Sequence, residues 1–361
     1  MSIKKDKYYI NLANNIAKNN LGYSGPNPSV GAVVVKKNNI LSFGLTNFSG
    51  RPHAEVSALN KLTFKDKKNS TIYISLEPCS HYGKTPPCVN KLIYSKVKKV
   101  VYSAEDVDQR TAGKAYKILK SHKIKVTKNI LNSISKKIYK NYFYSKKNQK
   151  PIVYGKLAIS KDFYTKNLNN KYITNELSLR TTHILRSKVN CILSSSKTIN
   201  EDNPKLDCRI DGLKKSSPQV AVLDKNLKIN INSFIVKNAK FNRTYLFYNK
   251  IDKNKFKLLK SKKLILIYAP LHNNNLNFSF ILKKLYNYEI SSLLVEGGKT
   301  LTLSLLKDNL FKEFYLFISP KLLNKTGIIK VNGIKSKLSK KFKKSKYNEI
   351  FLDKDDLIHY Y

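Results

Sequence analysis

The chain has 361 residues, which is long for a single hydrophobic core, so two domains are expected. A hydrophobic content of 41% excludes a disordered protein. No apolar run reaches the ~18 residues of a membrane span, and the first residues do not resemble a signal peptide, so a cytoplasmic protein is expected. The net charge of +46 comes from lysines spread from end to end, which favours attraction of anionic small molecules over a dedicated nucleic-acid surface.

The first part of the chain alternates helical and strand patterns. Apolar residues such as Tyr9, Ala13 and Ile16 recur at helical spacing, and β-branched runs indicate buried strands. The pattern predicts helices over residues 6–19, 53–62, 87–95 and 113–122, and strands over 30–35, 40–48, 71–76, 97–103 and 123–129. We expect the first two strands to form a hairpin. This order predicts a three-layer α/β domain.

Residues 130–150 begin as an amphipathic segment and end in a polar run that Pro151 follows, so we place a domain boundary there. The predicted domains are residues 1–146 and 151–361. The second α/β series has expected strands over 152–159, 191–195, 219–223, 244–248, 264–268, 292–295 and 314–318, and helices over 175–188, 278–288 and 299–309. Residues 349–361 are expected to return as an edge strand.

Three short segments carry residues that bind zinc. They are Pro52-His53-Ala54-Glu55, Glu77-Pro78-Cys79 and Pro87-Cys88. One imidazole and two thiolates can supply three of the four ligands of a tetrahedral zinc ion, which leaves its fourth coordination position open. A helix that begins near His53 would aim the imidazole at the start of the helix that carries Cys88, with Cys79 on the turn before it. Helix N-termini stabilise thiolates, so the sequence predicts one zinc ion held by these three residues.

Glu55 is the candidate proton carrier, because it follows His53 by two residues and can face the open position without binding the metal. A zinc-bound water has a pKa of about 7. Glu55 would accept its proton and deliver it to a ring nitrogen and then to the leaving amine. Zinc deaminases share this His-x-Glu pattern followed by two cysteines, although eight residues separate the cysteines here where two are usual.

Two other interpretations of these residues stay open from the sequence. The histidine, acid and cysteines could be unrelated packing residues, but a Pro-Cys after a strand and a cysteine at a proline-led helix start favour a metal site. A structural zinc site would close the shell with a fourth ligand, for which His81 is the nearby candidate. Cys191 and Cys208 lie outside any motif, and we interpret them as packing or surface thiols.

The chain resembles the bifunctional deaminase–reductase family of riboflavin biosynthesis. The resemblance is carried in the first domain by Pro26-Asn-Pro-Ser-Val-Gly-Ala-Val-Val-Val35, His53-Ala-Glu-Val56 and Leu76-Glu-Pro-Cys-Ser-His-Tyr-Gly-Lys-Thr-Pro-Pro-Cys88. The long interval between the cysteines is typical of this branch of the deaminases. Matches continue beyond Pro151, so the resemblance covers nearly the whole chain.

The resemblance implies a cytidine-deaminase-like first domain and a dihydrofolate-reductase-like second domain. In the family, the first domain uses zinc to remove an amine from 2,5-diamino-6-ribosylamino-4(3H)-pyrimidinone 5′-phosphate. The second uses NADPH to reduce the ribosyl group, which gives 5-amino-6-ribitylamino-uracil 5′-phosphate. The resemblance assigns the metal to His53, Cys79 and Cys88, and proton transfer to Glu55. The family's Asp-Pro-Asn-Pro loop is Asp106-Val-Asp-Gln109 here, which departs from the pattern.

In the second domain the resemblance lies in Lys156-Leu-Ala-Ile-Ser-Lys-Asp162, Tyr172-Ile-Thr174, Leu185-Arg186, Thr198-Ile-Asn-Glu-Asp-Asn-Pro204 and Glu296-Gly-Gly298. It implies NADPH contacts at Ala158, Tyr172, Thr198, Asp202, Lys225 and Gly298. It implies substrate contacts at Asn170, Arg186, Leu206, Arg209 and Glu296. Tyr172 replaces a usual tryptophan, Phe163 a usual glycine and Lys225 an expected serine, so we expect a changed local turn at Phe163 and a diverged but working reductase.

Elementary chemistry supports two of these implied roles. Gly297 and Gly298 follow a strand and open a helix, so the backbone can approach a pyrophosphate at the helix N-terminus. Arg186 can bind a phosphate with two parallel hydrogen bonds. Taken alone, a glycine pair is more often a tight turn and an arginine more often a solvated helix residue.

Three functions are compared. The first is the bifunctional enzyme, with a phosphorylated pyrimidine substrate, no nucleic-acid or membrane partner, and an oligomeric state left open between monomer and homo-oligomer. The second is a zinc deaminase acting on nucleic acid, against which the reductase-like second domain argues. The third is a deaminase fused to a non-catalytic module, which NADPH binding would exclude.

Overall fold

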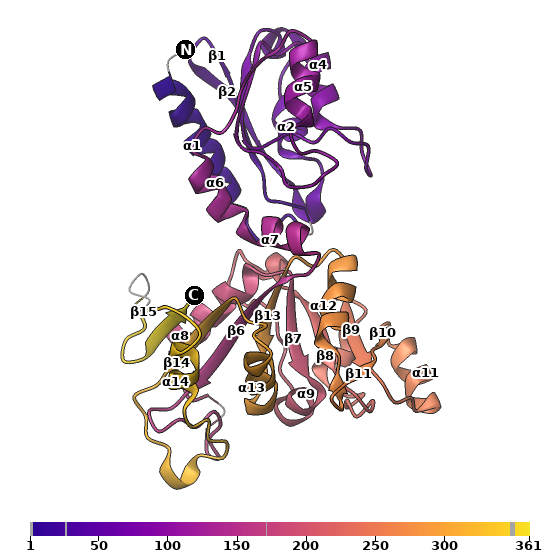
Figure 1. The fold of residues 1–361 in the computed structure, drawn as a ribbon, viewed down its shortest axis with the longest axis vertical. Helices are drawn as coiled ribbons and strands as arrows, with labels where there is room; N and C mark the ends of the chain where they lie inside the picture. The colour runs from indigo at the N-terminus through magenta and orange to yellow at the C-terminus, as the bar shows by residue number, and fades with distance from the viewer. Residues whose placement is uncertain (1–2, 26, 171, 347–350) are drawn as a thin grey trace. The chain divides into compact units, whose positions relative to one another are not determined.

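The computed structural model describes residues 3–25, 27–170, 172–346 and 351–361, and it divides the chain into two compact units, Met1–Gln149 and Lys150–Tyr361 (Figure 1). Each unit has its own sheet and its own hydrophobic core. Of the helices described, none combines the length and the apolar character that crossing a membrane requires.

The first unit is built on a five-stranded sheet. In spatial order its strands are β2 (Asn39–Leu45), β1 (Gly31–Lys36), β3 (Thr71–Leu76), β4 (Lys99–Ala104) and β5 (Lys125–Thr127). Strand β1 runs antiparallel to both neighbours, whereas β3, β4 and β5 are parallel. The predicted hairpin of β1 and β2 is confirmed, and Lys37 and Asn38 both have positive φ in its turn, as a tight two-residue hairpin requires.

Helices cover both faces of this sheet, so the predicted three-layer α/β arrangement is confirmed. The helices of the unit are α1 (Ile3–Asn19), α2 (Ala54–Leu59), α3 (Phe64–Lys67), α4 (Cys88–Tyr94), α5 (Lys114–Ser121), α6 (Asn132–Ile138) and α7 (Lys140–Asn148), with a 3-10 turn at Phe48–Gly50. Alternate strand residues face opposite ways: Val33 and Val35 pack against α1, while Val34 packs on the side of α2, α4 and α5.

Three predicted elements of this unit differ by three residues at one end: the helix over 6–19 begins at Ile3, the strand over 40–48 ends at Leu45, and the helix over 53–62 ends early. The segment 53–62 was expected to be a single helix, but α2 ends at Leu59. After Leu59 the amides of Lys61 and Leu62 donate to carbonyls three residues back, so residues 60–62 form turns, and Thr63 then caps the separate helix α3.

The second unit is built on a nine-stranded sheet. In spatial order its strands are β10 (Ile265–Tyr268), β9 (Thr244–Tyr248), β8 (Gln219–Leu223), β7 (Cys191–Ser195), β13 (Ser292–Glu296), β6 (Ile152–Ile159), β14 (Glu313–Ile318), β16 (Asp356–Tyr360) and β15 (Lys344–Lys346). The strands from β10 to β14 are parallel, and β16 and β15 are antiparallel to their neighbours. The predicted C-terminal strand forms, but it is second from the edge because β15 pairs outside it. Residues 349–350 of that prediction lie outside the described residues.

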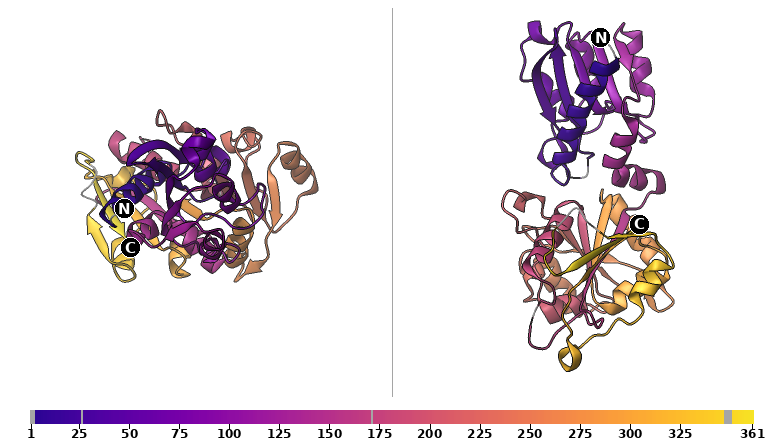
Figure 2. Two further views of the ribbon diagram at one scale, coloured as in Figure 1. Left: turned by 90° about the horizontal axis from the view of Figure 1, so that it is seen from above. Right: turned by 90° about the vertical axis from the view of Figure 1, so that its left-hand side faces the viewer.

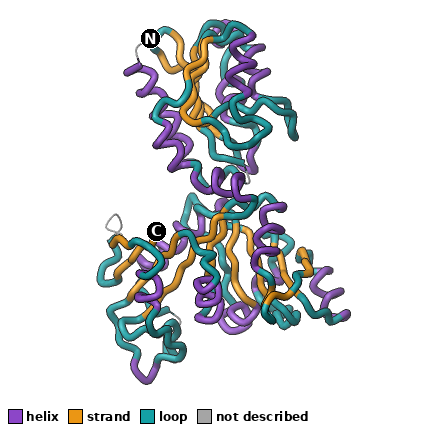
Figure 3. The backbone as a smooth tube through the Cα atoms, in the orientation of Figure 1, coloured by secondary structure: helices purple, strands orange, loops and turns teal. Residues whose placement is uncertain are grey.

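Helices pack on both faces of the larger sheet (Figures 2 and 3). They are α8 (Glu176–Ser187), α9 (Ser196–Asp202), α10 (Phe234–Lys237), α11 (Lys253–Ser261), α12 (Phe278–Asn287), α13 (Lys299–Lys307) and α14 (Ile334–Ser339), with 3-10 turns at Lys214–Ser216 and Asn324–Thr326 and a small hairpin of β11 (Leu271–His272) and β12 (Asn275–Leu276). The main core lies under α12, α13 and α14, whereas α8 packs against Phe317 on the opposite face. The carboxyl ends of the parallel strands share one edge, where ligands of such sheets bind.

Candidate functional site

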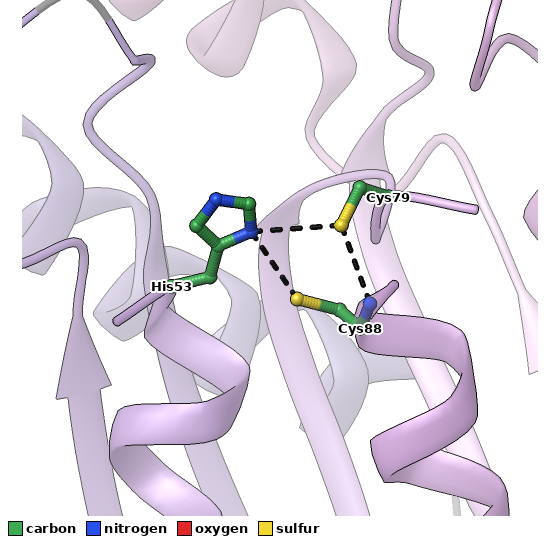
Figure 4. Close-up of side chains that lie close together, drawn as sticks. All are labelled: His53, Cys79 and Cys88. Carbon is green, nitrogen blue, oxygen red and sulfur yellow. Dashed lines mark hydrogen bonds between the residues drawn. The ribbon is translucent and has the colours of Figure 1, made fainter. Parts of the chain in front are cut away.

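Three side chains with metal-binding atoms converge in the first unit, as Figure 4 shows. His53 is the residue before α2, Cys79 follows β3, and Cys88 is the first residue of α4. The His53 Nδ1 atom lies 3.3 Å from Cys88 Sγ and 3.5 Å from Cys79 Sγ, and all three atoms lie within 4.8 Å of one another.

The spacing of these atoms fits zinc. A tetrahedral zinc ion with ordinary Zn–N and Zn–S bonds holds its nitrogen and sulfur ligands about 3.6 Å apart. Among the described residues, no further histidine, cysteine or carboxylate lies close enough to be a fourth ligand of the group. His81, the candidate fourth ligand, instead has its Nδ1 atom 3.0 Å from the Thr111 hydroxyl. Three protein ligands with one open position are typical of a catalytic zinc site.

Hydrogen bonds favour the thiolate form of Cys79. The Cys88 thiol lowers the pKa of Cys79 to about 4, assisted by His53 and by the Cys88 amide, which donates to Cys79 Sγ at 3.2 Å. The same interaction with Cys79, together with burial, raises the pKa of Cys88. The hydrogen bond with Cys79 raises the pKa of His53. Ionisation of one thiol therefore disfavours ionisation of the other, and a bound cation would allow both to ionise.

Glu55 lies in the first turn of α2, and only 3% of its surface is exposed. Burial raises the pKa of Glu55 to about 7, although the neighbouring His53 opposes this shift. A carboxyl group with a pKa near neutrality can both accept and donate a proton at physiological pH. Since Glu55 is not one of the clustered ligands, it is available for proton transfer.

The loop that departs from the family pattern is held by contacts within the first unit. Asp106 accepts a hydrogen bond from the Tyr142 hydroxyl at 3.0 Å, and Asp108 forms ion pairs with Arg110 at 2.6 Å and Lys146 at 3.0 Å. Glu77, next to the Cys79 turn, accepts hydrogen bonds from the amides of residues 106, 113 and 115. These contacts give the acidic residues a structural role beside the metal cluster.

The residues implied to contact NADPH mostly follow the carboxyl ends of adjacent strands. Ala158 lies near the end of β6, Thr198 follows β7, Lys225 follows β8, and Gly298 follows β13. Gly298 is the residue before α13, and a Cβ atom placed there would meet no atom within 4 Å, so a ligand has room to approach. By contrast, a Cβ atom at Gly297 would lie 2.7 Å from Leu301 Cδ2, so the Leu301 side chain would have to shift.

Two of the implied substrate residues contact each other. The Arg186 guanidinium donates two hydrogen bonds to the Glu296 carboxylate, at 2.6 and 2.9 Å, and a third to the Asp207 carbonyl at 3.0 Å. Burial opposes ionisation of Glu296, but Arg186 outweighs it and lowers the pKa of that carboxyl. The guanidinium is therefore oriented by the protein itself.

Of the other implied residues, Arg209 adjoins this pair through His183, and the rest have other surroundings. Among the contacts that the structure describes, Arg209 lies 3.2 Å from His183 Nε2, Asp202 pairs with Lys166 at 2.9 Å, and Lys225 donates to the Asn274 carbonyl at 2.7 Å. Leu206 is buried. Asn170 and Tyr172 are exposed on the segment before α8.

Two residues near the Arg186–Glu296 pair were given no role from the sequence, although Lys156 opens one of the motifs that carry the resemblance. Lys156 lies opposite Glu296 across β6 and β13, and burial lowers the pKa of Lys156 although Glu296 opposes the shift. His183 lies between Arg186 and Arg209 and contacts the Asp207 carbonyl at 3.0 Å. A lysine inside an otherwise apolar strand, and a histidine one helical turn before an arginine, were the available signals.

Comparison with family models supports both halves of the chain. A model described as the cytidine and deoxycytidylate deaminase zinc-binding region matches residues 3–104, and a model described as the RibD C-terminal domain matches residues 151–350.

Individual relatives match nearly the whole chain. The riboflavin biosynthesis protein RibD of Aquifex aeolicus is 33% identical over 333 residues, which cover 92% of this chain and 91% of the relative. The structure of Acinetobacter baumannii RibD superposes with a TM-score of 0.85 and 26% identity, covering 99% of each chain. A diaminohydroxyphosphoribosylaminopyrimidine deaminase/5-amino-6-(5-phosphoribosylamino)uracil reductase from Thermotoga maritima gives a TM-score of 0.81 and 27% identity, again covering 99% of each chain.

The predicted cytidine-deaminase-like and dihydrofolate-reductase-like domains are thus confirmed. With both domains present, a zinc-ligand cluster in the first and relatives matched from end to end, the chain belongs to the RibD family of riboflavin biosynthesis and is a bifunctional deaminase and reductase with zinc and NADPH as its cofactors.

Proposed function

We propose that the chain converts 2,5-diamino-6-ribosylamino-4(3H)-pyrimidinone 5′-phosphate to 5-amino-6-ribitylamino-uracil 5′-phosphate in two steps. Residues 1–146 form the zinc-dependent deaminase domain, and residues 151–361 form the NADPH-dependent reductase domain. The observation that carries the proposal is the cluster of His53, Cys79 and Cys88 beside the buried Glu55.

In the deaminase domain, His53, Cys79 and Cys88 would hold the zinc ion. When bound in such a site, zinc supplies Lewis-acid activation of water at neutral pH. Glu55 takes up a proton at its carboxylate, delivers it to the ring nitrogen of the pyrimidine, and then protonates the leaving amine. Burial of Glu55 supports this role, because burial brings the pKa of its carboxyl to about 7.

In the reductase domain, the edge formed by the carboxyl ends of β6, β7, β8 and β13 would bind NADPH and substrate. NADPH supplies the hydride, and the task of the protein is orientation. The N-terminus of α13 at Gly298 favours the pyrophosphate of the cofactor. The paired Arg186 and Glu296 side chains present a fixed polar group to the substrate, with Thr198, Asp202 and Arg209 on the neighbouring segments.

The even spread of basic residues supports a small-molecule partner and not a nucleic acid. The first unit has 28 Lys and Arg against 7 Asp and Glu, and the second has 41 against 16, so both units carry an excess of basic residues. We therefore propose a phosphorylated pyrimidine as the partner, without nucleic acid or membrane, in the cytoplasm.

The test is to incubate the purified full chain with the diamino substrate, with and without NADPH, and to identify the products by mass. Without NADPH, the deaminated ribosyl compound should accumulate, and with NADPH the ribityl compound should form. Deamination without any ribityl product at saturating NADPH would restrict the function to the first domain. If neither product forms in the zinc-loaded protein, the proposal is wrong.

A further inference from the structure

A cavity lies in the first unit where the first turns of helix α1 meet the turn between β1 and β2. Its volume is about 360 Å³. Pockets that bind small ligands range from roughly 300 to 1,000 Å³. The residues that line the cavity are Lys4, Lys5, Tyr8, Tyr9 and Asn38. It is therefore large enough for one small ligand.

Strand pairing places this cavity away from the metal cluster. Strands β1 and β3 are antiparallel, and Val35, close to the turn, pairs with Thr71 at the start of β3. Cys79 follows the other end of β3. The cavity and the metal cluster thus lie at opposite ends of the sheet, and the proposed reactions use none of the residues that line the cavity.

Contacts between the helix and the turn hold the wall of the cavity. The Tyr9 hydroxyl donates a hydrogen bond to the Asn38 carbonyl at 2.9 Å, and Lys5 Nζ donates to Asn38 Oδ1 at 3.2 Å. The Tyr9 ring packs against Tyr73 of β3, with 4.9 Å between the ring centroids. The cavity is therefore supported by the sheet beneath it.

Tyr8 presents an aromatic surface to this cavity. Its ring meets the Tyr9 ring at 76° with centroids 5.2 Å apart, while 60% of Tyr8 stays exposed. Stacking on an aromatic ring is a sequence-tolerant way to bind a nucleobase, because every base has a π-face. Tyr8 is thus a supported ring on which a flat ligand can stack.

The positive charge at the cavity has no acidic partner. Asp6 belongs to the same turn of α1, but it is buried, pairs with Lys99 at 2.6 Å and accepts a hydrogen bond from the Tyr73 hydroxyl at 3.0 Å. Within the described parts of the chain, no ion pair joins Lys4 or Lys5 to a carboxylate. Two ammonium groups are therefore available to an anion, and lysine binds phosphate as a point charge.

A ring that carries a phosphate uses both features of the cavity. We propose that the cavity binds a small phosphorylated aromatic compound of the mononucleotide class, with its ring on Tyr8 and its phosphate at Lys4 and Lys5. This site is additional to the two candidate active sites, so the inference does not rest on the proposed function.

Calorimetric titration of adenosine 5′-phosphate into the zinc-loaded full chain tests this inference. Saturating NADPH is present throughout, so that the nucleotide does not occupy the cofactor site of the second unit. Adenosine and inorganic phosphate are titrated separately, because each carries one half of the ligand. We expect saturable binding of adenosine 5′-phosphate, and at least about 10-fold weaker binding of each half, since stacking and a charge-assisted contact each contribute about that factor.

Variants of exposed residues locate the binding. Tyr8→Ala should weaken binding of adenosine 5′-phosphate by about 10-fold or more, whereas Tyr8→Phe keeps the ring and should match the wild type. Lys4→Ala plus Lys5→Ala should weaken the nucleotide and inorganic phosphate but not adenosine. Lys18→Ala is the matched control, because it removes an exposed lysine at the other end of the same helix. Zinc content and both enzymatic activities should be unchanged in all four proteins.

Three results would overturn the inference. The first is a wild type without saturable binding of adenosine 5′-phosphate. The second is wild-type affinity in Tyr8→Ala or in the double lysine variant, because the nucleotide would then bind elsewhere. The third is equal affinity of the wild type for adenosine and for adenosine 5′-phosphate, because the phosphate would then not be recognised.

Discussion

At the scale of single residues, we expect the deaminase chemistry to depend on the side chain of Glu55. Glu55→Gln keeps the size of the buried group and removes its ability to carry a proton. We expect a zinc-replete, folded variant whose deaminase kcat falls by at least about 10²-fold, since general acid–base catalysis contributes about 10²–10⁴-fold. The measurement is turnover of the diamino substrate alongside zinc content. Near-normal turnover would assign proton transfer to another group.

The four cysteines divide into two pairs with different expected roles. Cys79 and Cys88 contribute the sulfur atoms of the cluster, whereas Cys191 and Cys208 are buried in the second unit. The double variant Cys79→Ser plus Cys88→Ser should lose its zinc, because hydroxyls are poor replacements for thiolate ligands. Cys191→Ser plus Cys208→Ser is the control and should retain one zinc per chain, as measured by metal analysis. Equal zinc in both variants would place the metal elsewhere.

Asp162 is expected to make the stability of the second unit depend on pH. Its carboxylate accepts hydrogen bonds from the Ser160 hydroxyl at 2.6 Å and from the amides of Leu323 at 3.1 Å and Asn324 at 2.8 Å. Burial opposes ionisation, but these hydrogen bonds outweigh it and lower the pKa of Asp162 from 3.8 to about 2. Because the folded-state pKa is the lower one, the stabilisation is complete above about pH 4 and disappears as the pH falls toward 2.

Asp162→Asn should therefore lower the free energy of unfolding by about 1–2 kcal/mol at neutral pH. The difference from wild type should shrink as the pH falls below about 4. Urea unfolding, monitored by a signal from the second unit at neutral and acidic pH, measures both the loss of stability and its change with pH. Asp211→Asn is the control, because among the described residues that exposed side chain pairs with Lys214, and a surface pair contributes little. A wild-type–variant difference that stays constant across this pH range would contradict the prediction.

At the scale of elements, the metal cluster depends on the packing of strand β2 against helix α2. A Cβ atom at Gly44 would lie 2.2 Å from the Ala54 carbonyl oxygen and 2.4 Å from the Ala58 amide nitrogen, both backbone atoms of α2. Gly44→Ala should push α2 outward, lower the free energy of unfolding by about 1–3 kcal/mol, and weaken zinc binding, because His53 directly precedes that helix.

Chelator competition measures the zinc affinity of this variant, and chemical unfolding measures its stability. Gly83→Ala is the matched control on the loop between the cysteines, where the nearest atom to a new Cβ is 3.6 Å away. Its zinc affinity should equal that of the wild type. A Gly44→Ala protein with wild-type zinc affinity would show that α2 can move without disturbing the ligands.

Helices and strands were predictable from the sequence where buried residues recur in a regular pattern. Strands β3, β6, β7, β8 and β9 have the predicted bounds, because continuous apolar, β-branched runs are typical of buried parallel strands. The short helices α3, α9 and α10 were not predicted, because one or two turns contain too few residues to show a helical period. The strand β15 was missed as well, since it is short, lysine-rich and forms only by pairing with β16.

At the scale of the whole molecule, we expect the two activities to be separable, because each candidate site lies within one unit. Arg186→Ala should abolish reduction and leave deamination intact. Glu55→Gln should abolish deamination and leave reduction of the deaminated compound intact. Mixing the two variants with the diamino substrate and NADPH should restore the ribityl product. Product mass measures this complementation, and retained NADPH binding shows that Arg186→Ala is folded. A mixture of folded variants that forms no ribityl product would contradict independent sites.

The zinc cluster and the two fold classes were determined by the sequence itself. Zinc accepts few ligand types, so His53, Cys79 and Cys88 with Glu55 nearby were recognisable without coordinates. The expected changed turn at Phe163 is a different case. Its backbone holds φ at 70°, in the left-handed region that favours glycine, while its ring packs against the core. Burial of the ring therefore compensates for a backbone conformation that the residue type alone would not choose.

Only the tertiary structure decided which partners the charged side chains have. Arg186 pairs with Glu296, 110 residues away, and Arg51 reaches Thr85 and the outer nitrogen of His53. Local patterns determine helices, strands and ligand types, because they depend on neighbouring residues. A contact between distant charged groups depends on how sheets and loops pack, and no local pattern encodes it. For this reason the candidate metal ligands were evident from the sequence, whereas the environment of Arg51 and the Arg186–Glu296 pair was not.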